Sequence, residues 1–466
     1  MNKVKKNQIV EVEVENIAFG GKGLAKLNGY TLFIDQAVTG DLASVRITKK
    51  KKSYAEARIE RLIKPSSLRV EAPCPYSGHC GGCKWQFLEY GQQIEYKKRH
   101  VQESLQHIGH LHDVTVRDTI ASPKVFGYRN KMEFTCARRR WLLPQEMQTD
   151  DPLQAGIALG LHVPGTFYKV LDTRTCLLQP DLGNRILDDI RHYINVSPLP
   201  VYGLRSHSGF WRFVTLRHSA AHDNWMVNLV TAEENREAVQ TLADALMKTY
   251  SGIVSMVNNV TDRKAGVAVG QKELYLGGSA FLEDRIGKYA FKISANSFFQ
   301  TNTAGAEQLY AAVKKYAALE GHETVLDMFC GTGTIAIYLS GAAREIIGIE
   351  QVESAVRDAE SNCRANNVEN CRFIQGDMRD CLKDVEPFAD VIIVDPPRAG
   401  MHKEVLAQVL ALRPDRIVYV SCNPATLARD LGLMAQDYEV MEIQPVDMFP
   451  HTYHIEAVTR LTLRNT

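Results

Sequence analysis

The sequence of 466 residues lacks several features that would place it in a membrane or outside the cell. It has no run of about 18 or more apolar residues, so no segment is predicted to cross a membrane as a helix. Its N-terminal segment has no apolar core of the kind found in secretory signals, and we therefore expect a cytoplasmic protein. It also has no fixed-period repeat and no low-complexity tract beyond one lysine run, which excludes a fibre or a disordered scaffold.

The sequence has little net charge: 55 basic and 54 acidic side chains leave +1, which argues against a nucleic-acid partner. This small sum conceals an uneven distribution. Residues 1–64 carry 13 basic and 7 acidic side chains, a net charge of +6, whereas residues 301–466 carry 15 and 24, a net charge of −9. Opposite charge at the two ends indicates different partners for different domains.

The first predicted domain comprises residues 1–64. Alternating apolar residues in the segment 7–62 are interrupted by turn signals roughly every ten residues, which predicts a small β-barrel. The run Lys49–Lys52 fits either a solvated hairpin tip or a phosphate-contacting loop on an oligonucleotide-binding barrel.

The second predicted domain, residues 65–298, mixes strand-like pieces with a few helices, and we expect an α+β fold of unassigned topology. Residues 91–109 form an amphipathic helix in this interpretation, with the basic run Lys97–His100 on its polar face. Two basic and aromatic stretches, Tyr128-Arg129 and Arg138–Arg140, are either RNA contacts or ordinary surface charge.

The third predicted domain, residues 299–466, alternates helices and strands, which implies a parallel α/β sheet covered on both faces. The predicted strands are Thr324–Phe329, Glu345–Glu350, Cys371–Gln375, Val391–Asp395, Ile417–Ser421 and Val458–Leu463.

The first of these strands runs into a glycine turn and then a helix, as in nucleotide-binding folds. Gly331 allows the backbone to approach a ligand, and Glu350 at the end of the second strand can bind two ribose hydroxyls. The third glycine of a dinucleotide fingerprint is absent. The acids at successive strand ends would repel a pyrophosphate but suit a cationic sulfonium, so S-adenosylmethionine is favoured over NAD. These acids are Asp327, Glu350, Asp377 and Asp395.

Two residues near the C-terminus are candidates for the chemistry itself. Cys422 lies at the carboxyl end of a strand that Asn423 and Pro424 end at once, so its thiol is expected at the rim of the sheet. A thiolate of low pKa there would be a nucleophile, whereas the alternative is an inert core cysteine. Glu456 has apolar neighbours, which are typical of a carboxyl with a raised pKa that acts as a general base. The alternative is an ordinary glutamate at a strand end, and the presence of Cys422 favours the base.

The motifs resemble those of bacterial RNA (uracil-C5)-methyltransferases that carry a TRAM barrel and an iron–sulfur motif. The catalytic half contributes Ser297-Phe-Phe-Gln300, Asp395-Pro-Pro-Arg398, Ser421-Cys-Asn-Pro424 and His454-Ile-Glu456. Residues 7–64 look like the TRAM barrel, and Cys74-Pro-Tyr-Ser-Gly-His-Cys-Gly-Gly-Cys83 looks like the cluster motif. The resemblance covers essentially the whole chain. It implies an OB-like barrel, a central α+β domain with a cluster, and a Rossmann-like methyltransferase domain.

The resemblance implies a covalent mechanism. Cys422 would add to C6 of uracil, the activated C5 would take the methyl group of S-adenosylmethionine, and Glu456 would then remove the C5 proton. Asp395 would contact the target base or help to position it. The resemblance places the cofactor among Gln300, Phe329, Gly331, Thr334, Glu350, Asp377 and Asp395.

The resemblance also implies a 4Fe-4S cluster held by Cys74, Cys80, Cys83 and a distant fourth ligand. Cys176 is the best candidate for that ligand, and Cys136 competes with it. Zinc is the alternative metal, because four thiolates would suit it as well. We expect a structural role for the cluster, and residues 91–124 are expected to pack on the catalytic domain.

Members with both the barrel and the cluster mostly act on ribosomal RNA, so 23S rRNA is the expected partner. The first alternative is a tRNA T-loop methyltransferase with the same chemistry. The second, of another class, is a non-catalytic RNA-binding iron–sulfur protein. No membrane contact is expected, and nothing in the sequence indicates an obligate protein partner.

Overall fold

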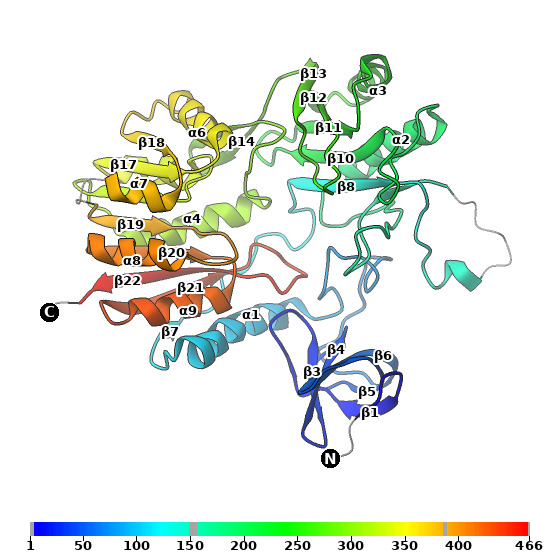
Figure 1. Cartoon of the computed structure of the whole chain (residues 1–466), viewed down its shortest axis with the longest axis horizontal. Helices are drawn as coiled ribbons and strands as arrows, with labels where there is room; N and C mark the ends of the chain where they lie inside the picture. The colour runs from blue at the N-terminus through cyan, green and yellow to red at the C-terminus, as the bar shows by residue number, and fades with distance from the viewer. Residues whose placement is uncertain (1–3, 149–155, 385–388, 465–466) are drawn as a thin grey trace.

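The computed structural model describes residues 4–148, 156–384 and 389–464, and it contains three large sheets (Figure 1). The N-terminal strands lie at the bottom of the view, the middle sheet at the upper right and the C-terminal sheet at the left. Within the described ranges, no helix is both long and apolar enough to cross a membrane.

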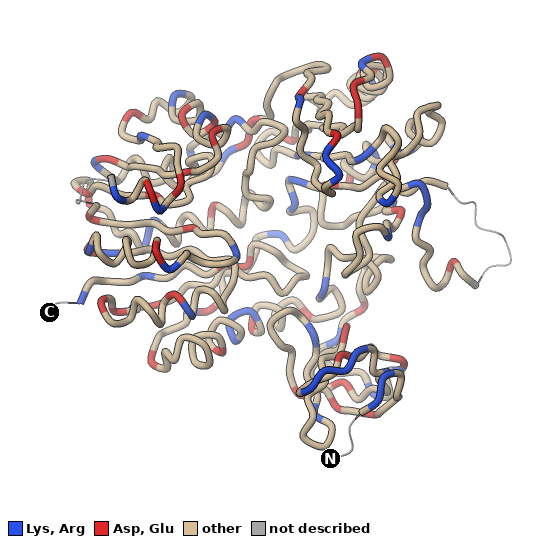
Figure 2. Tube along the Cα trace, in the orientation of Figure 1, with Lys and Arg blue, Asp and Glu red and all other residues tan. Residues whose placement is uncertain are grey.

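The N-terminal sheet has six strands in the order β1-β5-β6-β4-β3-β2. Every second residue of β5 is buried, including Ala43, Val45 and Ile47, because successive side chains of a strand point to opposite faces. The lysine run Lys49–Lys52 ends β5 and continues into the turn before β6 with its side chains exposed, and Figure 2 shows basic residues concentrated on this sheet. Its strands are β1 (Ile9–Glu13), β2 (Asn16–Ile17), β3 (Gly23–Leu27), β4 (Tyr30–Asp35), β5 (Leu42–Lys50) and β6 (Tyr54–Lys64).

The middle sheet also has six strands, in the order β13-β12-β11-β10-β8-β9. Apolar residues of two helices pack with it into one core, as shown by Ile190 of α2 and Leu242 of α3. The short hairpin β14–β15 then leads into the last domain. The elements are β8 (Lys131–Ala137), β9 (Ala158–Gly160), α2 (Asp181–Val196), β10 (Trp211–His218), β11 (Trp225–Thr231), α3 (Arg236–Thr249), β12 (Ile253–Val260), β13 (Lys272–Gly278), β14 (Leu282–Ile286) and β15 (Tyr289–Ile293).

The C-terminal sheet has eight strands in the order β18-β17-β16-β19-β20-β22-β21-β7. The first five run parallel, whereas β22 pairs antiparallel with β20 and with β21. The expected parallel α/β sheet is present, with β21 and β7 added at one edge. The strands are β7 (Thr115–Val116), β16 (Thr324–Met328), β17 (Glu345–Glu350), β18 (Cys371–Gln375), β19 (Val391–Val394), β20 (Arg416–Ser421), β21 (Tyr438–Val446) and β22 (Glu456–Leu463).

Helices cover both faces of this sheet, and two separate apolar cores lie on its two sides. One face is covered by α4 (Thr303–Ala317), α5 (Thr334–Leu339) and α6 (Glu353–Ala365). The other is covered by α7 (Met378–Asp384), α8 (Lys403–Leu412), α9 (Pro424–Met434) and the distant α1 (Tyr90–Ser104).

The prediction that Lys97–His100 form a polar face of α1 is partly wrong. The side chains of Lys97 and His100 are fully buried, whereas Arg99 is exposed. Because α1 packs against the C-terminal domain on one side and the N-terminal strands on another, more of its surface is covered than its apolar stripe alone predicts. The next strand, β7, pairs in parallel with β21. It therefore belongs to the C-terminal sheet, although the other strands of that sheet begin only at β16.

Candidate active site

The loop after β16 is shaped for a close ligand. Three of its residues have positive φ, at 61° for Phe329, 54° for Gly331 and 71° for Gly333. A side chain at Gly331 would meet no atom within 4 Å, so the space beside this backbone is open. The turn therefore presents bare main chain to an empty region of the sheet edge.

A pocket of about 430 Å³ lies next to this turn. Three residues predicted for the cofactor line it, and they come from the ends of three different strands. Glu350 is fixed by the turn, because one carboxylate oxygen accepts a hydrogen bond from the Gly331 amide at 3.0 Å and the other from the Val352 amide at 2.9 Å. The pocket is lined by Phe329, Glu350, Gln351, Asp377, Met378, Arg379, Pro397, Gly400, His402 and Val405.

Asp377 is a fixed negative charge in this pocket. The guanidinium of Arg379 donates two hydrogen bonds of 2.9 Å to its carboxylate, and together with a backbone hydrogen bond this lowers the pKa of Asp377 to about 2. Arg379 was not predicted from the sequence, although it lies only two residues after Asp377. The carboxylate is therefore ionised at any physiological pH.

Three further residues predicted for the cofactor surround the buried Tyr310 and do not line the pocket. The Tyr310 hydroxyl lies 2.7 Å from that of Thr334, and Gln300 also bonds to it. Burial is the main cause that raises the pKa of Tyr310, with a contribution from the nearby Asp395. Tyr310 was not predicted, because nothing in its helical sequence distinguishes it from a core residue.

Cys422 and Glu456 meet at the edge where β20 and β22 pair. Ser421 is opposite Ala457, so Cys422 continues one strand and Glu456 begins the other at the same level. Asn423 fixes the turn after the cysteine: its side-chain oxygen accepts from the Ala425 amide at 3.1 Å, and its amide nitrogen donates to the Arg398 carbonyl at 3.1 Å. The two motif loops are thus tied together.

The electrostatics of this edge favour protonated groups. Burial, with the carboxyls of Glu456 and Asp395, raises the pKa of the Cys422 thiol to about 11, although the Arg398 charge and a backbone hydrogen bond oppose this. The expectation of a lowered thiol pKa is therefore wrong, because burial and, after it, the two nearby carboxyls favour the protonated thiol. Burial likewise raises the pKa of Asp395 to about 7 and the pKa of Glu456 well above its usual value.

Comparison with known proteins places this geometry in a family. Residues 219–464 match the family described as tRNA (Uracil-5-)-methyltransferase. An uncharacterised RNA methyltransferase of Chlorobaculum tepidum is 41% identical, with 97% of this chain and 96% of the relative covered. Another, of Bacteroides thetaiotaomicron, is 38% identical over 96% of this chain and 100% of the relative. The chain belongs to the tRNA (uracil-5-)-methyltransferase family.

The N-terminal part of this uracil-5 methyltransferase matches the TRAM domain over residues 3–59, as the sequence predicted. Its structure is similar to that of the Pyrococcus abyssi tRNA (uracil-54, C5)-methyltransferase, which was solved in complex with S-adenosyl-L-homocysteine. The TM-score is 0.76 at 29% identity, and the match covers 97% of this chain and 99% of the other. The TRAM barrel and the Rossmann-like methyltransferase fold of the prediction are therefore confirmed.

The four cysteines predicted as cluster ligands line one small pocket in this methyltransferase. The Gly82 amide donates to the Cys80 sulfur at 3.3 Å, and the Gln86 side chain donates to the Cys83 sulfur at 3.2 Å. Cys136, the competing candidate, is fully buried and does not line this pocket. In the described part of the chain, no three His, Cys, Asp or Glu side chains are arranged to hold a metal ion.

Proposed function

We propose that the chain methylates C5 of uracil in RNA through a covalent bond between Cys422 and C6 of the base. The observation that carries this proposal is the meeting of a thiol and a high-pKa carboxyl at one sheet edge, with the loops around them joined by Asn423. A nucleophile and a proton acceptor on adjacent strands match the two requirements of the reaction.

S-adenosylmethionine is the proposed methyl donor and supplies an electrophilic methyl group when bound. The open space beside Gly331 and the carboxylates that line the pocket fit a cationic ligand with ribose hydroxyls. In this assignment Glu350 would accept hydrogen bonds from the ribose hydroxyls, Asp377 would accept one from the adenine amino group, and Phe329 would pack against the adenosine.

The residues of the site indicate which group loses or accepts a proton at each step. The Cys422 thiol and the Glu456 carboxyl first lose their protons to solvent. The sulfur then forms a bond to C6 while the electron pair of the C5–C6 double bond moves towards C5. After C5 has taken the methyl group, which would leave S-adenosylhomocysteine, Glu456 accepts the C5 proton, the double bond reforms and the C6–sulfur bond breaks. Glu456 suits this last step because a raised pKa makes it a stronger base once it is ionised.

The RNA that we propose is 23S rRNA, supported by the TRAM barrel, which has more basic than acidic residues, and by the cysteine motif. The bases that carry the target atom must leave their stack to reach Cys422. A second candidate is uracil 54 of tRNA, favoured by the likeness to the Pyrococcus abyssi enzyme over nearly the whole chain.

Methylation of purified transcripts tests this proposal. The chain would be incubated with S-adenosylmethionine and either 23S rRNA or tRNA, and nucleoside mass spectrometry would measure 5-methyluridine. We expect the product in 23S rRNA and none with the Cys422→Ala variant. Product in tRNA alone would establish the second candidate, and full activity of Cys422→Ala would contradict the covalent route.

We also propose that Cys74, Cys80, Cys83 and Cys176 hold a 4Fe-4S cluster. The four thiols line one pocket, and amide groups donate to two of the sulfurs, as suits thiolate ligands. Zinc would need the sulfurs to converge on one ion, whereas the corners of a four-iron cluster leave them further apart. Zinc stays the alternative occupant, because four thiolates would suit it as well.

The two candidates for the fourth ligand give a matched test. Cys176→Ser is expected to lose iron, acid-labile sulfide and visible absorbance when purified without oxygen, whereas Cys136→Ser keeps all three. Both thiols are buried and belong to the same core, so loss of packing alone would affect them alike. Equal iron content in the two variants would contradict the assignment.

A further inference from the structure

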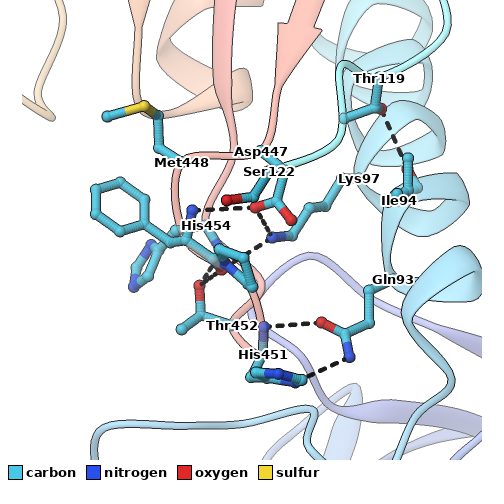
Figure 3. Close-up of polar contacts among 12 residues, drawn as sticks. Gln93, Ile94, Lys97, Thr119, Ser122, Asp447, Met448, His451, Thr452 and His454 are labelled. Carbon is cyan, nitrogen blue, oxygen red and sulfur yellow. Dashed lines mark hydrogen bonds and ion pairs between the residues drawn. The ribbon is translucent and has the colours of Figure 1, made fainter. Parts of the chain in front are cut away.

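An ion pair without solvent contact joins α1 to the segment that precedes β22. Lys97 and Asp447 are 350 residues apart, both side chains are fully buried, and the ammonium nitrogen lies 2.6 Å from a carboxylate oxygen (Figure 3). Lys97 also donates to the Phe449 carbonyl at 3.0 Å. Burying two charges is costly, so a pair in this position requires a reason beyond stability.

A second group of contacts fixes the tip of the same segment. The Gln93 side chain accepts a hydrogen bond from the His451 amide at 2.8 Å, and its own amide nitrogen lies 3.3 Å from the His451 ring (Figure 3). The backbone amides of Lys84 and Trp85, which directly follow Cys83, both donate to the His451 carbonyl, at 2.8 and 2.9 Å. The cysteine-bearing segment and α1 therefore hold this loop from two sides.

The fixed loop ends at the proposed base. It connects Val446 to Glu456, and these two residues are the last cross-strand partners of β21 and β22. The terminal pair of a ladder frays when nothing beyond it is held. In this protein the residues beyond it are bound to α1, so contacts more than 350 residues away in sequence hold the segment that leads to Glu456.

We propose that Lys97, Gln93 and Asp447 are positioning residues, which hold Glu456 where it can accept the C5 proton. This inference rests on the proposed function. Its specific consequence is kinetic: loosening the loop slows the release of the methylated base from Cys422, which needs Glu456, and leaves the earlier bond formation by Cys422 unchanged.

The test uses the full chain in single turnovers with RNA and methyl-labelled S-adenosylmethionine. Denaturing gels would follow the labelled protein–RNA adduct as it forms and decays. Asp447→Asn is expected to form the adduct at the wild-type rate and to release product ~10²-fold more slowly, the typical effect of a misplaced catalytic group. The double variant Lys97→Met with Asp447→Asn removes both charges at similar volume, so it keeps the test valid where the single variant unfolds.

The matched control is Glu323→Gln. Glu323 is also a buried carboxylate of the C-terminal domain, but it accepts from Glu320 and Gly321 at the start of β16, away from the site. If the double variant releases product at the wild-type rate while Glu456→Gln releases it slowly, the positioning role is overturned and the proposed function stands. A wild-type chain that forms no adduct through Cys422 would instead overturn the proposed function.

Discussion

Two aspartates at the same edge of the C-terminal sheet have opposite proton affinities. Asp377 follows β18 and has a pKa of about 2, whereas Asp395 follows β19 and has a pKa of about 7. The first is half-buried and pairs with Arg379, whereas the second is half-buried and forms no ion pair with any residue that the structure describes. The edge therefore has two regions. Beside Arg379, Asp377 keeps a fixed negative charge that suits binding, whereas around Asp395 a carboxyl can gain or lose a proton.

The largest expected effect lies in the region of mobile protons. Glu456→Gln removes the only carboxylate that we assign as proton acceptor, so turnover should fall by ~10²- to 10⁴-fold, the usual contribution of a general base. The labelled adduct with Cys422 should accumulate, because bond formation does not need this group. Turnover within tenfold of the wild type would assign the proton to another acceptor.

A smaller effect is expected where the charge is fixed. Glu350→Ala removes hydrogen bonds from a charged acceptor, each typically about 1.5–3 kcal/mol, so affinity for S-adenosylmethionine should weaken by ~10- to 100-fold. Saturating S-adenosylmethionine should restore the turnover rate of Glu350→Ala, whereas it should not restore that of Glu456→Gln. The control is Glu353→Ala, since Glu353 is exposed at the start of α6 and, among the described residues, forms an ion pair with Arg357 alone. Equal affinities for the two variants would contradict the pocket assignment.

The smallest expected effect is a difference in stability between the variants Asp395→Asn and Asp377→Asn. Because the pKa of Asp395 is raised in the folded chain, its protonated form is the stable one, and the wild type loses stability as pH rises from about 4 to 7. Asp395→Asn mimics that form and should stabilise the chain at pH 8 by on the order of 2 kcal/mol, with a smaller gain at pH 5.5.

Asp377→Asn should behave oppositely. The lowered pKa of Asp377 gives stability above about pH 4 that is lost as pH falls towards 2, so the variant should be slightly less stable at pH 8. Thermal unfolding of both variants at pH 8 and pH 5.5 measures the difference. A change of the same sign in both would remove the contrast between the two regions.

Strand ends were the most predictable part of the molecule. Continuous apolar runs identified five parallel strands almost to the residue, and the rule that acids at strand ends share an edge brought Glu350 and Asp377 to one pocket. Gln300 and Thr334 instead surround Tyr310, because helix packing decides where they point. The cysteine motif predicted which thiols gather, while their role stays a prediction.

Features that depend on distant segments could not be predicted from local patterns, and only the family resemblance implied that residues 91–124 pack on the catalytic domain. The pairing of β7 with β21 and the burial of Lys97 both arise because residues 90–120 return to the C-terminal sheet, and no local pattern encodes that return. The raised pKa of Cys422 depends on which carboxyls face the sulfur in space. A lysine beside other basic residues looks solvated until its partner, here Asp447, is known.

Trapping with RNA that contains 5-fluorouridine tests the central claim most directly. Fluorine at C5 cannot leave as a proton, so the bond between the enzyme and C6 should persist after methyl transfer. We expect a complex stable on denaturing gels that maps to the peptide with Cys422, is lost in Cys422→Ala and is kept in Cys363→Ala, which changes a buried cysteine of α6. An adduct that survives Cys422→Ala, or that maps to another cysteine, would contradict the account.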